Sequence, residues 1–116
     1  MLLVDDHADT REMYAEFLVA MGLETRQATT CAMALEAVAS DAIDAIVLDR
    51  RLPDGDGASV SRTLRGDPRT HTLPIVVISG TTNDGSVIAD AYLLKPVIPE
   101  ALFAAVAGLL GLKPGG

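Results

Sequence analysis

Three carboxylates stand directly after apolar runs of the sequence and could share one divalent cation. Asp5 and Asp6 follow the run 2–4, and Asp49 follows the run 46–48. If the two runs are neighbouring parallel strands, the three side chains meet at one edge of a sheet. Because close carboxylates repel each other, such a cluster needs protons or a cation to neutralise it. A hard, oxygen-preferring ion such as Mg²⁺ is the expected occupant.

Two later residues add a hydroxyl and an ammonium to this set. Ser79 ends the apolar run 75–78, and Lys95 ends the run 92–94 just before Pro96. Taken alone, a strand-terminal serine usually bonds nearby backbone and a lysine is usually a solvated surface charge. Together, the acids, the metal, the hydroxyl and the ammonium predict a site for phosphoryl chemistry.

The elements that must position these residues alternate between strand-like and helix-like segments, the pattern of an α/β fold with a parallel sheet. In such doubly wound sheets, ligands bind outside the carboxyl ends of the strands. Because the second strand is polar, we expect it at an edge of the sheet. The five expected strands cover 2–4, 23–28, 43–48, 75–78 and 92–94; the expected helices lie at 9–21, around 31–38, around 60–66 after the loop 49–57, and from Pro99 onward.

The first helix carries the most detailed expectations. Asp9 is the expected N-cap, since aspartate is a favoured residue at that position. Helical spacing places Met13, Phe17, Ala20 and Met21 on one apolar face. We expect this face to pack on the sheet.

Composition narrows the class of protein. A chain of 116 residues fits one domain with one core and leaves no room for a second, output domain. Sixteen acidic and nine basic residues give a net charge of −7, so direct nucleic-acid binding is not expected.

The longest apolar stretch, 101–112, is too short to cross a bilayer and no secretory signal precedes Asp5, so we expect a cytoplasmic protein without membrane insertion. Cys31 is the only cysteine and is expected to be a small buried hydrophobe.

The chain resembles the receiver domain of response regulators, the phospho-accepting module of two-component signalling. The resemblance covers essentially the whole sequence as one domain, 1–116, with 113–116 as a flexible tail or the start of a linker. It implies a flavodoxin-like sheet of order 2-1-3-4-5 with helices on both faces. It rests on four fragments, each at the end of an expected strand: Leu3-Val4-Asp5-Asp6, Val47-Leu48-Asp49-Arg50-Arg51-Leu52-Pro53-Asp54-Gly55, Val77-Ile78-Ser79-Gly80 and Ala91-Tyr92-Leu93-Leu94-Lys95-Pro96.

The resemblance also implies roles for the residues of the predicted site. Asp49 would accept a phosphoryl group from a phosphohistidine of a histidine kinase or histidine phosphotransfer protein, with Mg²⁺ or Mn²⁺ as cofactor. Asp6, Asp49 and the backbone carbonyl of Arg51 would hold the metal, and Asp5 would act through a bound water. Lys95 would pair with a phosphoryl oxygen.

A switch is implied by the same resemblance. Ser79 would donate a hydrogen bond to the phosphoryl group, and its movement would let Tyr92 rotate inward and change the face read by a downstream effector domain or protein. The Lys95–Pro96 bond resembles the family's cis peptide. Such a chain is a signalling domain and not an enzyme, although it would assist its own phosphorylation and dephosphorylation.

One segment departs from the family pattern. Only eleven residues, 80–90, separate the fourth and fifth strands, where the family has two loops and a full helix. The fourth helix must therefore be shortened or missing. Residues 81–85 favour a loop, which leaves 86–90 for a single helical turn.

Two other histidine and acid patterns have ordinary interpretations. Asp54 and Asp56 resemble part of a calcium loop, but the spacing fails at Ala58 and the distal glutamate is absent, which indicates turn chemistry. His7, next to the acidic pair, could touch the site or tune the lifetime of the phosphoryl group, but the simpler expectation is an exposed residue at a helix entrance. His71 is expected to lie in a polar loop. Neither has a second metal ligand at convincing spacing.

Two alternative functions remain open. A degenerate receiver would keep the fold and act as a phosphorylation-independent interaction module; the intact set of five site residues argues against it. A small phosphatase of the haloacid-dehalogenase type also uses a strand-terminal aspartate and Mg²⁺. It needs a second acid two residues after the nucleophile, and Arg51 stands there instead.

Overall fold

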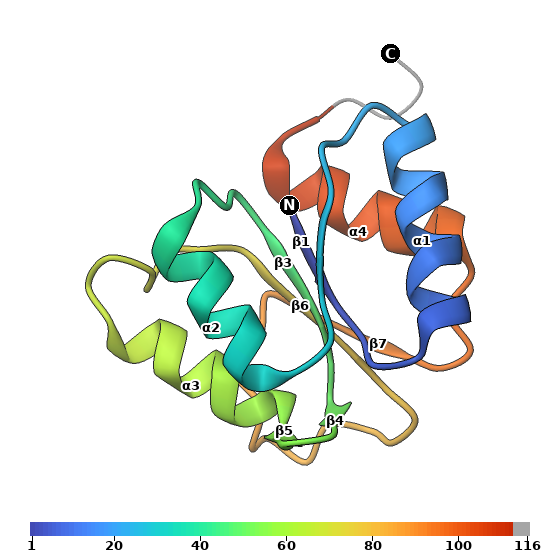
Figure 1. The fold of residues 1–116 in the computed structure, drawn as a ribbon. Coiled ribbons are helices and arrows are strands. Elements are labelled where there is room, and N and C mark those ends of the chain that lie inside the picture. Colours follow the sequence, from blue (N-terminus) through green and yellow to red (C-terminus); the bar gives the residue numbers. More distant parts are fainter. Residues whose placement is uncertain (113–116) are drawn as a thin grey trace.

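One parallel sheet forms the centre of the molecule. The structure, a computed structural model, describes residues 1–112 (Figure 1). The strand order β2-β1-β3-β6-β7 is the predicted flavodoxin-like order of five strands, and the polar β2 lies at an edge as expected. The predicted tail 113–116 lies outside the described residues. The strands are β1 (Leu2–Val4), β2 (Arg26–Ala28), β3 (Ile46–Asp49), β6 (Ile75–Ser79) and β7 (Ala91–Leu94).

Four helices of the described chain cover the two faces of this sheet. They are α1 (Ala8–Ala20), α2 (Cys31–Ser40), α3 (Gly57–Gly66) and α4 (Pro99–Leu110). Figure 1 shows α1 and α4 on one face and α2 and α3 on the other. Within residues 1–112, none of the helices is both long and apolar enough to cross a membrane.

Burial explains why the three central strands are almost purely apolar. Every residue of β1, β3 and β6 is buried, because helices cover both of their faces. Successive side chains point to opposite faces, so Leu2 and Val4 join the core under α2 and α3 whereas Leu3 joins the core under α1 and α4. This alternation leaves only the strand ends free for polar chemistry.

The first helix differs from the sequence prediction in its start and in its buried face. Its N-cap is His7, which makes no side-chain cap hydrogen bond, so the assignment to Asp9 is wrong. Asp9 lies instead in the first turn, where its charge is favourable beside the helix N-terminus.

The buried face of α1 is rotated by one residue from the predicted one. Two stripes of this helix have apolar residues at helical spacing, and packing on the sheet selects the stripe that includes Tyr14. Tyr14 also donates a hydrogen bond to the Val97 carbonyl at 2.6 Å, which ties α1 to the segment before α4. The buried residues are Tyr14, Ala15 and Leu18, whereas Met13, Ala20 and Met21 are exposed and Phe17 is half-buried.

A short hairpin after β3 ties two helices together. It consists of β4 (Arg51–Leu52) and β5 (Gly55–Asp56), in the region predicted as a loop. The Asp54 carboxylate accepts hydrogen bonds from the backbone N–H groups of Cys31 at 2.8 Å and Ala32 at 3.0 Å, so it caps α2 from outside that helix. Asp56 caps α3 by accepting from the Ala58 N–H at 2.9 Å. The turn residues therefore fix the ends of α2 and α3 beside the carboxyl end of β3.

Residues 80–90 form no helix and no strand. The predicted helical turn at 86–90 is therefore wrong, and the fourth helix of the family pattern is missing. The side chain of Asn83 accepts hydrogen bonds from the N–H groups of Gly85 and Val87, at 3.0 and 3.3 Å, and Asp84 accepts from Ser86 at 3.0 Å. Such short polar side chains compete with helical hydrogen bonding for the backbone donors.

Candidate functional site

The carboxylates of Asp5, Asp6 and Asp49 meet at one edge of the sheet. Strands β1 and β3 pair in parallel with Val4 opposite Leu48, so the next residues, Asp5 and Asp49, lie side by side. Asp5, Asp6, His7 and Asp49 each offer one ligand atom, and these atoms all lie within 4.8 Å of one another. Asp5 is 5% and Asp49 3% exposed, whereas Asp6 and His7 face solvent.

The surroundings of Asp49 hold its carboxylate in place. Its Oδ1 accepts a hydrogen bond from the backbone N–H of Arg51 at 3.1 Å. The start of α3 packs against the same residue: a Cβ at position 57 would lie 2.6 Å from the Asp49 carbonyl oxygen, so only Gly57 fits there. Arg51, the first residue of β4, is the residue whose carbonyl the resemblance assigned to the metal, and its own side chain is exposed.

Lys95 brings a positive charge to this carboxylate. Its Nζ lies 3.0 Å from Asp49 Oδ2. The backbone places it there, because the Lys95 N–H donates to the Ser79 carbonyl at 2.8 Å and continues the pairing of β6 with β7. The Lys95–Pro96 peptide is cis, as the resemblance implied.

Ser79 lies at the end of β6 and is buried, with its hydroxyl turned to the following loop. Its Oγ accepts a hydrogen bond from the Thr81 N–H at 3.1 Å and lies 3.2 Å from Thr81 Oγ1. The cavity beside it has a volume of about 270 Å³ and is lined by Asp49, Arg50, Arg51, Ser79, Gly80, Thr81 and Lys95.

The electrostatics of the acid cluster favour an added cation. Burial raises the pKa of Asp5 above its ordinary value of 3.8, and the charge of Asp49 raises it further. The His7 backbone N–H and the Lys95 charge act in the opposite direction but do not cancel the rise. A cation bound among these carboxylates would favour the ionised form of Asp5.

Tyr92 is joined to the loop that follows Ser79. Its hydroxyl donates a hydrogen bond to the Thr81 carbonyl at 2.7 Å and accepts one from Arg50 Nη1 at 3.2 Å. The predicted switch residues Ser79 and Tyr92 therefore contact the same residue, Thr81.

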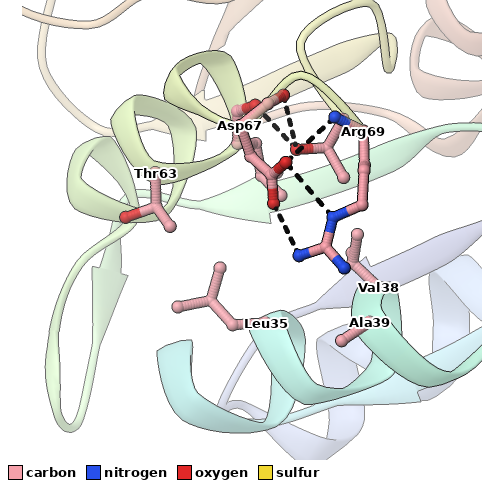
Figure 2. A pocket seen from close by; sticks show the side chains of 8 residues that line it. Leu35, Val38, Ala39, Thr63, Asp67 and Arg69 are labelled. Carbon is pink, nitrogen blue, oxygen red and sulfur yellow. Dashed lines mark hydrogen bonds and ion pairs between the residues drawn. The ribbon is translucent and has the colours of Figure 1, made fainter.

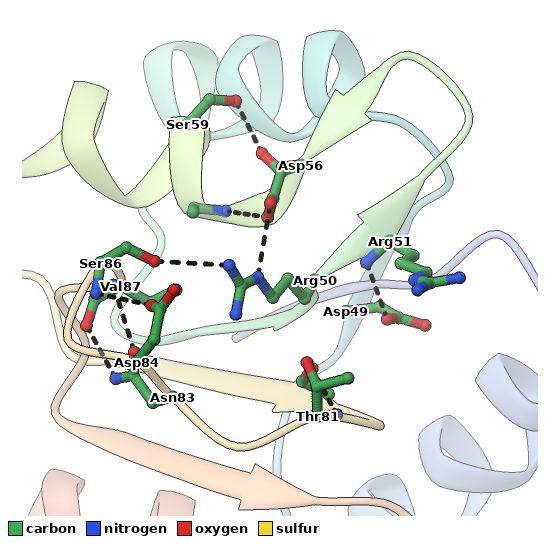
Figure 3. Close-up of polar contacts among 12 residues, drawn as sticks. Asp49, Arg50, Arg51, Asp56, Ser59, Thr81, Asn83, Asp84, Ser86 and Val87 are labelled. Carbon is green, nitrogen blue, oxygen red and sulfur yellow. Dashed lines mark hydrogen bonds and ion pairs between the residues drawn. The ribbon is translucent and has the colours of Figure 1, made fainter.

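Sequence reasoning missed Arg50, which connects three segments. Its guanidinium contacts Asp56 Oδ2 at 3.3 Å and Ser86 Oγ at 3.4 Å (Figure 3). It also donates a hydrogen bond to the Tyr92 hydroxyl. Nothing in the sequence indicated this role except its position directly after Asp49.

Both positions considered for His7, exposed at a helix entrance and in contact with the site, are found together. Its side chain is 71% exposed at the entrance of α1, as expected, and Nδ1 lies 3.2 Å from Asp6 Oδ1 and 3.5 Å from Asp5 Oδ1. The adjacency of His7 to the two acids was the available signal.

A separate cavity of about 270 Å³ lies between α2 and α3 (Figure 2). Its charged lining residues pair with each other, since Arg69 Nη2 lies 3.1 Å from Asp67 Oδ2. Most of the remaining lining is aliphatic, as for Leu35 and Val38. Asp5, Asp6, Asp49 and Lys95 do not line this cavity, so the candidate site is the one at the strand ends.

Comparisons with known proteins agree with the fold of this chain. The transcriptional regulatory protein GltR of Pseudomonas aeruginosa is 31% identical over 116 residues, which cover 95% of this chain and 48% of GltR. A two-component response regulator from Clostridium difficile superposes with a TM-score of 0.83 at 30% identity, covering 95% of this chain and 93% of that one. The receiver domain of the sensor histidine kinase PA1611 from Pseudomonas aeruginosa, solved with magnesium in its active site cleft, superposes with a TM-score of 0.86 at 24% identity and 95% coverage of both chains.

Among the curated relatives, the chain matches only a part of each protein. It spans about half of the length of GltR and of the regulator PhoB, and about a quarter of PleD. The model of the family described as the response regulator receiver domain matches residues 1–107. This chain therefore belongs to the response regulator receiver domain family.

Proposed function

We propose that this receiver domain accepts a phosphoryl group on Asp49 from a phosphohistidine of a histidine kinase or histidine phosphotransfer protein. The observation that carries the proposal is the setting of the Asp49 carboxylate. It is buried, and one of its oxygens lies 3.0 Å from Lys95 Nζ. It also has a carboxylate oxygen within 4.8 Å of carboxylate oxygens of Asp5 and Asp6. A buried acid beside an ammonium and two further acids is typical of a site built to handle phosphate charge.

In the proposed reaction, a carboxylate oxygen of Asp49 attacks phosphorus. The new P–O bond forms as the P–N bond of the phosphohistidine breaks, and the released imidazole takes up a proton. Lys95 would pair with a phosphoryl oxygen as charge moves onto the acyl phosphate. Ser79 would turn its hydroxyl from Thr81 to a second phosphoryl oxygen.

The donor set of this chain fits a divalent metal. Asp5, Asp6 and Asp49, with the backbone carbonyl of Arg51, are the groups that would hold Mg²⁺ or Mn²⁺, because hard dications prefer oxygen ligands. When bound, the ion would offset the charge of the acids and of the incoming phosphoryl group. The PA1611 receiver domain supports the fold at 24% identity, so the assignment of the metal rests on the acids of this chain.

The switch that we propose runs through Thr81. A Ser79 hydroxyl that turns toward the phosphoryl group would release Thr81, whose carbonyl accepts the Tyr92 hydrogen bond. Tyr92 would then change position and alter the surface that a downstream effector domain or protein reads. We propose that residues 1–116 form one such receiver domain and that it works in the cytoplasm, where its phosphodonors would be found.

Mass spectrometry after incubation with acetyl phosphate and Mg²⁺ tests the proposal. We expect the wild type to gain the mass of one phosphoryl group and Asp49→Asn to gain none. Asp9→Asn, which changes an exposed acid of α1, is the matched control and should be phosphorylated like the wild type. A folded wild type that gains no phosphoryl group would refute the proposal.

The alternative of a phosphorylation-independent interaction module is favoured by one observation, the missing helix at 80–90. In that case, the wild type would bind its partner equally well with and without the phosphoryl group. The phosphatase alternative loses support because the chain belongs to a family of signalling domains.

A further inference from the structure

We propose that His7 supplies an imidazole nitrogen to the divalent cation held by Asp5, Asp6 and Asp49, so that the site favours first-row transition-metal dications over Mg²⁺. This inference rests on the metal-dependent function proposed above and concerns the choice of ion at that same site.

The geometry places one ring nitrogen of His7 among the carboxylate oxygens. Nδ1 lies 3.2 Å from Asp6 Oδ1 and 3.5 Å from Asp5 Oδ1, and a ring nitrogen of His7 belongs to the group of ligand atoms that lie within 4.8 Å of one another. Ligand atoms bound about 2.1 Å from one ion lie about 3 Å apart when adjacent and about 4 Å apart when opposite. The spacing of the four residues is thus close to that of ligands of a single ion.

The backbone at the start of α1 holds His7 next to the acids. The His7 N–H donates to Asp5 Oδ1 at 2.9 Å, and His7 is the N-cap residue of the helix, with an extended backbone conformation. Its side chain is 71% exposed, so the ring can adjust toward an ion without disturbing the core. The turn thus holds the imidazole beside the acids and leaves it free to rotate.

The chemistry of the ring determines which ions benefit. Mg²⁺ prefers oxygen ligands and keeps several waters, so a neighbouring imidazole adds little to its binding. Imidazole is a good ligand for Co²⁺, Ni²⁺ and Zn²⁺, and affinity for a mixed nitrogen and oxygen site rises from Mn²⁺ to Co²⁺ and beyond. Three carboxylates attract any dication through their charge. An imidazole added as a fourth ligand therefore increases the affinity for Co²⁺, Ni²⁺ and Zn²⁺ more than the affinity for Mg²⁺.

The same distances would also suit a protonated His7 that acts as a counter-ion to the acids. The two roles predict opposite results. A counter-ion competes with every dication, so its removal would strengthen the binding of Mg²⁺ and of Co²⁺. A ligand contributes only to ions that accept nitrogen, so its removal would weaken Co²⁺ and leave Mg²⁺ unchanged.

Isothermal titration calorimetry with Mg²⁺ and Co²⁺ separates these roles. We expect His7→Ala to weaken Co²⁺ binding by about tenfold or more, in the range seen when groups supporting a metal site are removed, and to leave Mg²⁺ binding unchanged. His71→Ala, which removes the other histidine of the sequence from the exposed loop before β6, should change neither ion. Circular dichroism checks that each variant is folded.

Pulsed electron paramagnetic resonance of bound Mn²⁺ gives a direct readout. We expect coupling to a ¹⁴N nucleus in the wild type and in His71→Ala, and no such coupling in His7→Ala. An absent nitrogen coupling in the wild type, an equal change for both ions in His7→Ala, or a loss of Co²⁺ binding in His71→Ala would overturn the inference.

The variant Asp6→Asn distinguishes a failure of this inference from a failure of the proposed function. It should weaken both Mg²⁺ and Co²⁺ if the acids form the metal site. If the wild type binds neither ion, both the metal site and the role of His7 are refuted. If Mg²⁺ binds and His7→Ala leaves Co²⁺ affinity unchanged, only the role of His7 is refuted.

Discussion

The carboxyl edge of the sheet and the segment 80–90 are neighbouring regions that are held in place in different ways. At the sheet edge, the backbone register of buried strands sets the positions of Asp5, Asp49 and Ser79. Residues 80–90 belong to no helix or strand, so side chains determine their path. The first region depends on the fold itself, and the second depends on particular residues.

The anchors of segment 80–90 come from several elements. Arg65 Nη2 pairs with Asp90 Oδ2 at 2.6 Å, and the Ser61 hydroxyl donates to the Ile88 carbonyl, so α3 holds the second half of the segment. Arg50 reaches Ser86 from the end of β3 (Figure 3).

Arg50 also connects the two regions, because it follows Asp49 directly and its side chain reaches Ser86. Its backbone N–H donates to the Ile78 carbonyl at 2.9 Å, and its carbonyl accepts from the Gly57 N–H at 2.7 Å. The main chain of Arg50 is thus fixed with the sheet, and its guanidinium contacts the irregular segment. Apart from Arg50 and the hydrogen bonds between Ser79 and Thr81, separate contacts stabilise each region.

We expect the largest effect from a change at the sheet edge, measured as the rate of phosphorylation of Asp49. Lys95→Ala removes the ammonium beside Asp49 and should slow phosphorylation by acetyl phosphate about a hundredfold, as for removal of one charge-stabilising group from an active site. Phosphorylation is followed by mass spectrometry at fixed Mg²⁺. Arg62→Ala, an exposed cation on α3, is the control and should react at the wild-type rate. An unchanged rate in Lys95→Ala would show that the ammonium does not act in the reaction.

The next effect concerns the anchoring of segment 80–90. Val87 is 5% exposed and packs in the core under α2 and α3, whereas its neighbour Ile88 is 54% exposed. Val87→Ala should lower the free energy of unfolding by about 2 kcal/mol, because it removes buried methyl groups and leaves a cavity. Ile88→Ala should change it by less than about 0.5 kcal/mol. Chemical denaturation measures both.

The phosphorylation rate of the Val87→Ala variant tests whether segment 80–90 and the sheet edge are held independently. If the two regions are held independently, the folded variant is phosphorylated at the wild-type rate. A large loss of rate would show that the packing of segment 80–90 also positions the phosphoryl site.

Sequence reasoning succeeded where position follows from strand register. The pairing of β1 with β3 and of β6 with β7 brings Asp5, Asp49, Ser79 and Lys95 to one edge, and apolar runs followed by polar residues are enough to predict it. The roles assigned to these residues stay predictions until they are tested.

The details that failed depend on tertiary contacts that the pattern does not encode. Two stripes of α1 have apolar residues at helical spacing, and only packing on the sheet selects the one with Tyr14. The contacts of Arg50 and His7 depend on side-chain rotamers of residues distant along the chain or at a turn. The path of residues 80–90 depends on hydrogen bonds that the side chains of Asn83 and Asp84 accept from backbone N–H groups, which compete with a helical turn.

We expect the smallest effect from the acid cluster, which should lower the stability of the folded chain at neutral pH when no metal is bound. The pKa of Asp5 is raised in the folded chain, first by burial and then by the charge of Asp49. A carboxyl whose folded pKa exceeds its unfolded pKa binds protons more tightly when folded, so stability falls as pH rises from the ordinary value of 3.8 through the folded pKa. With EDTA present, Asp5→Asn should therefore raise the melting temperature at neutral pH, and this gain should disappear below the ordinary pKa.

Added Mg²⁺ should reverse the sign of this difference. A cation that binds the folded wild type stabilises it by mass action, and the variant that lacks one carboxylate gains less. Thermal melts of both chains, with EDTA and with Mg²⁺ at neutral pH, measure the reversal. Glu16→Gln on the exposed face of α1 is the matched control and should show neither the gain nor the reversal. If the wild type is more stable than Asp5→Asn in EDTA, the acids at the sheet edge stabilise the fold without a bound metal. That result would contradict the idea that their repulsion is the cost of a metal site.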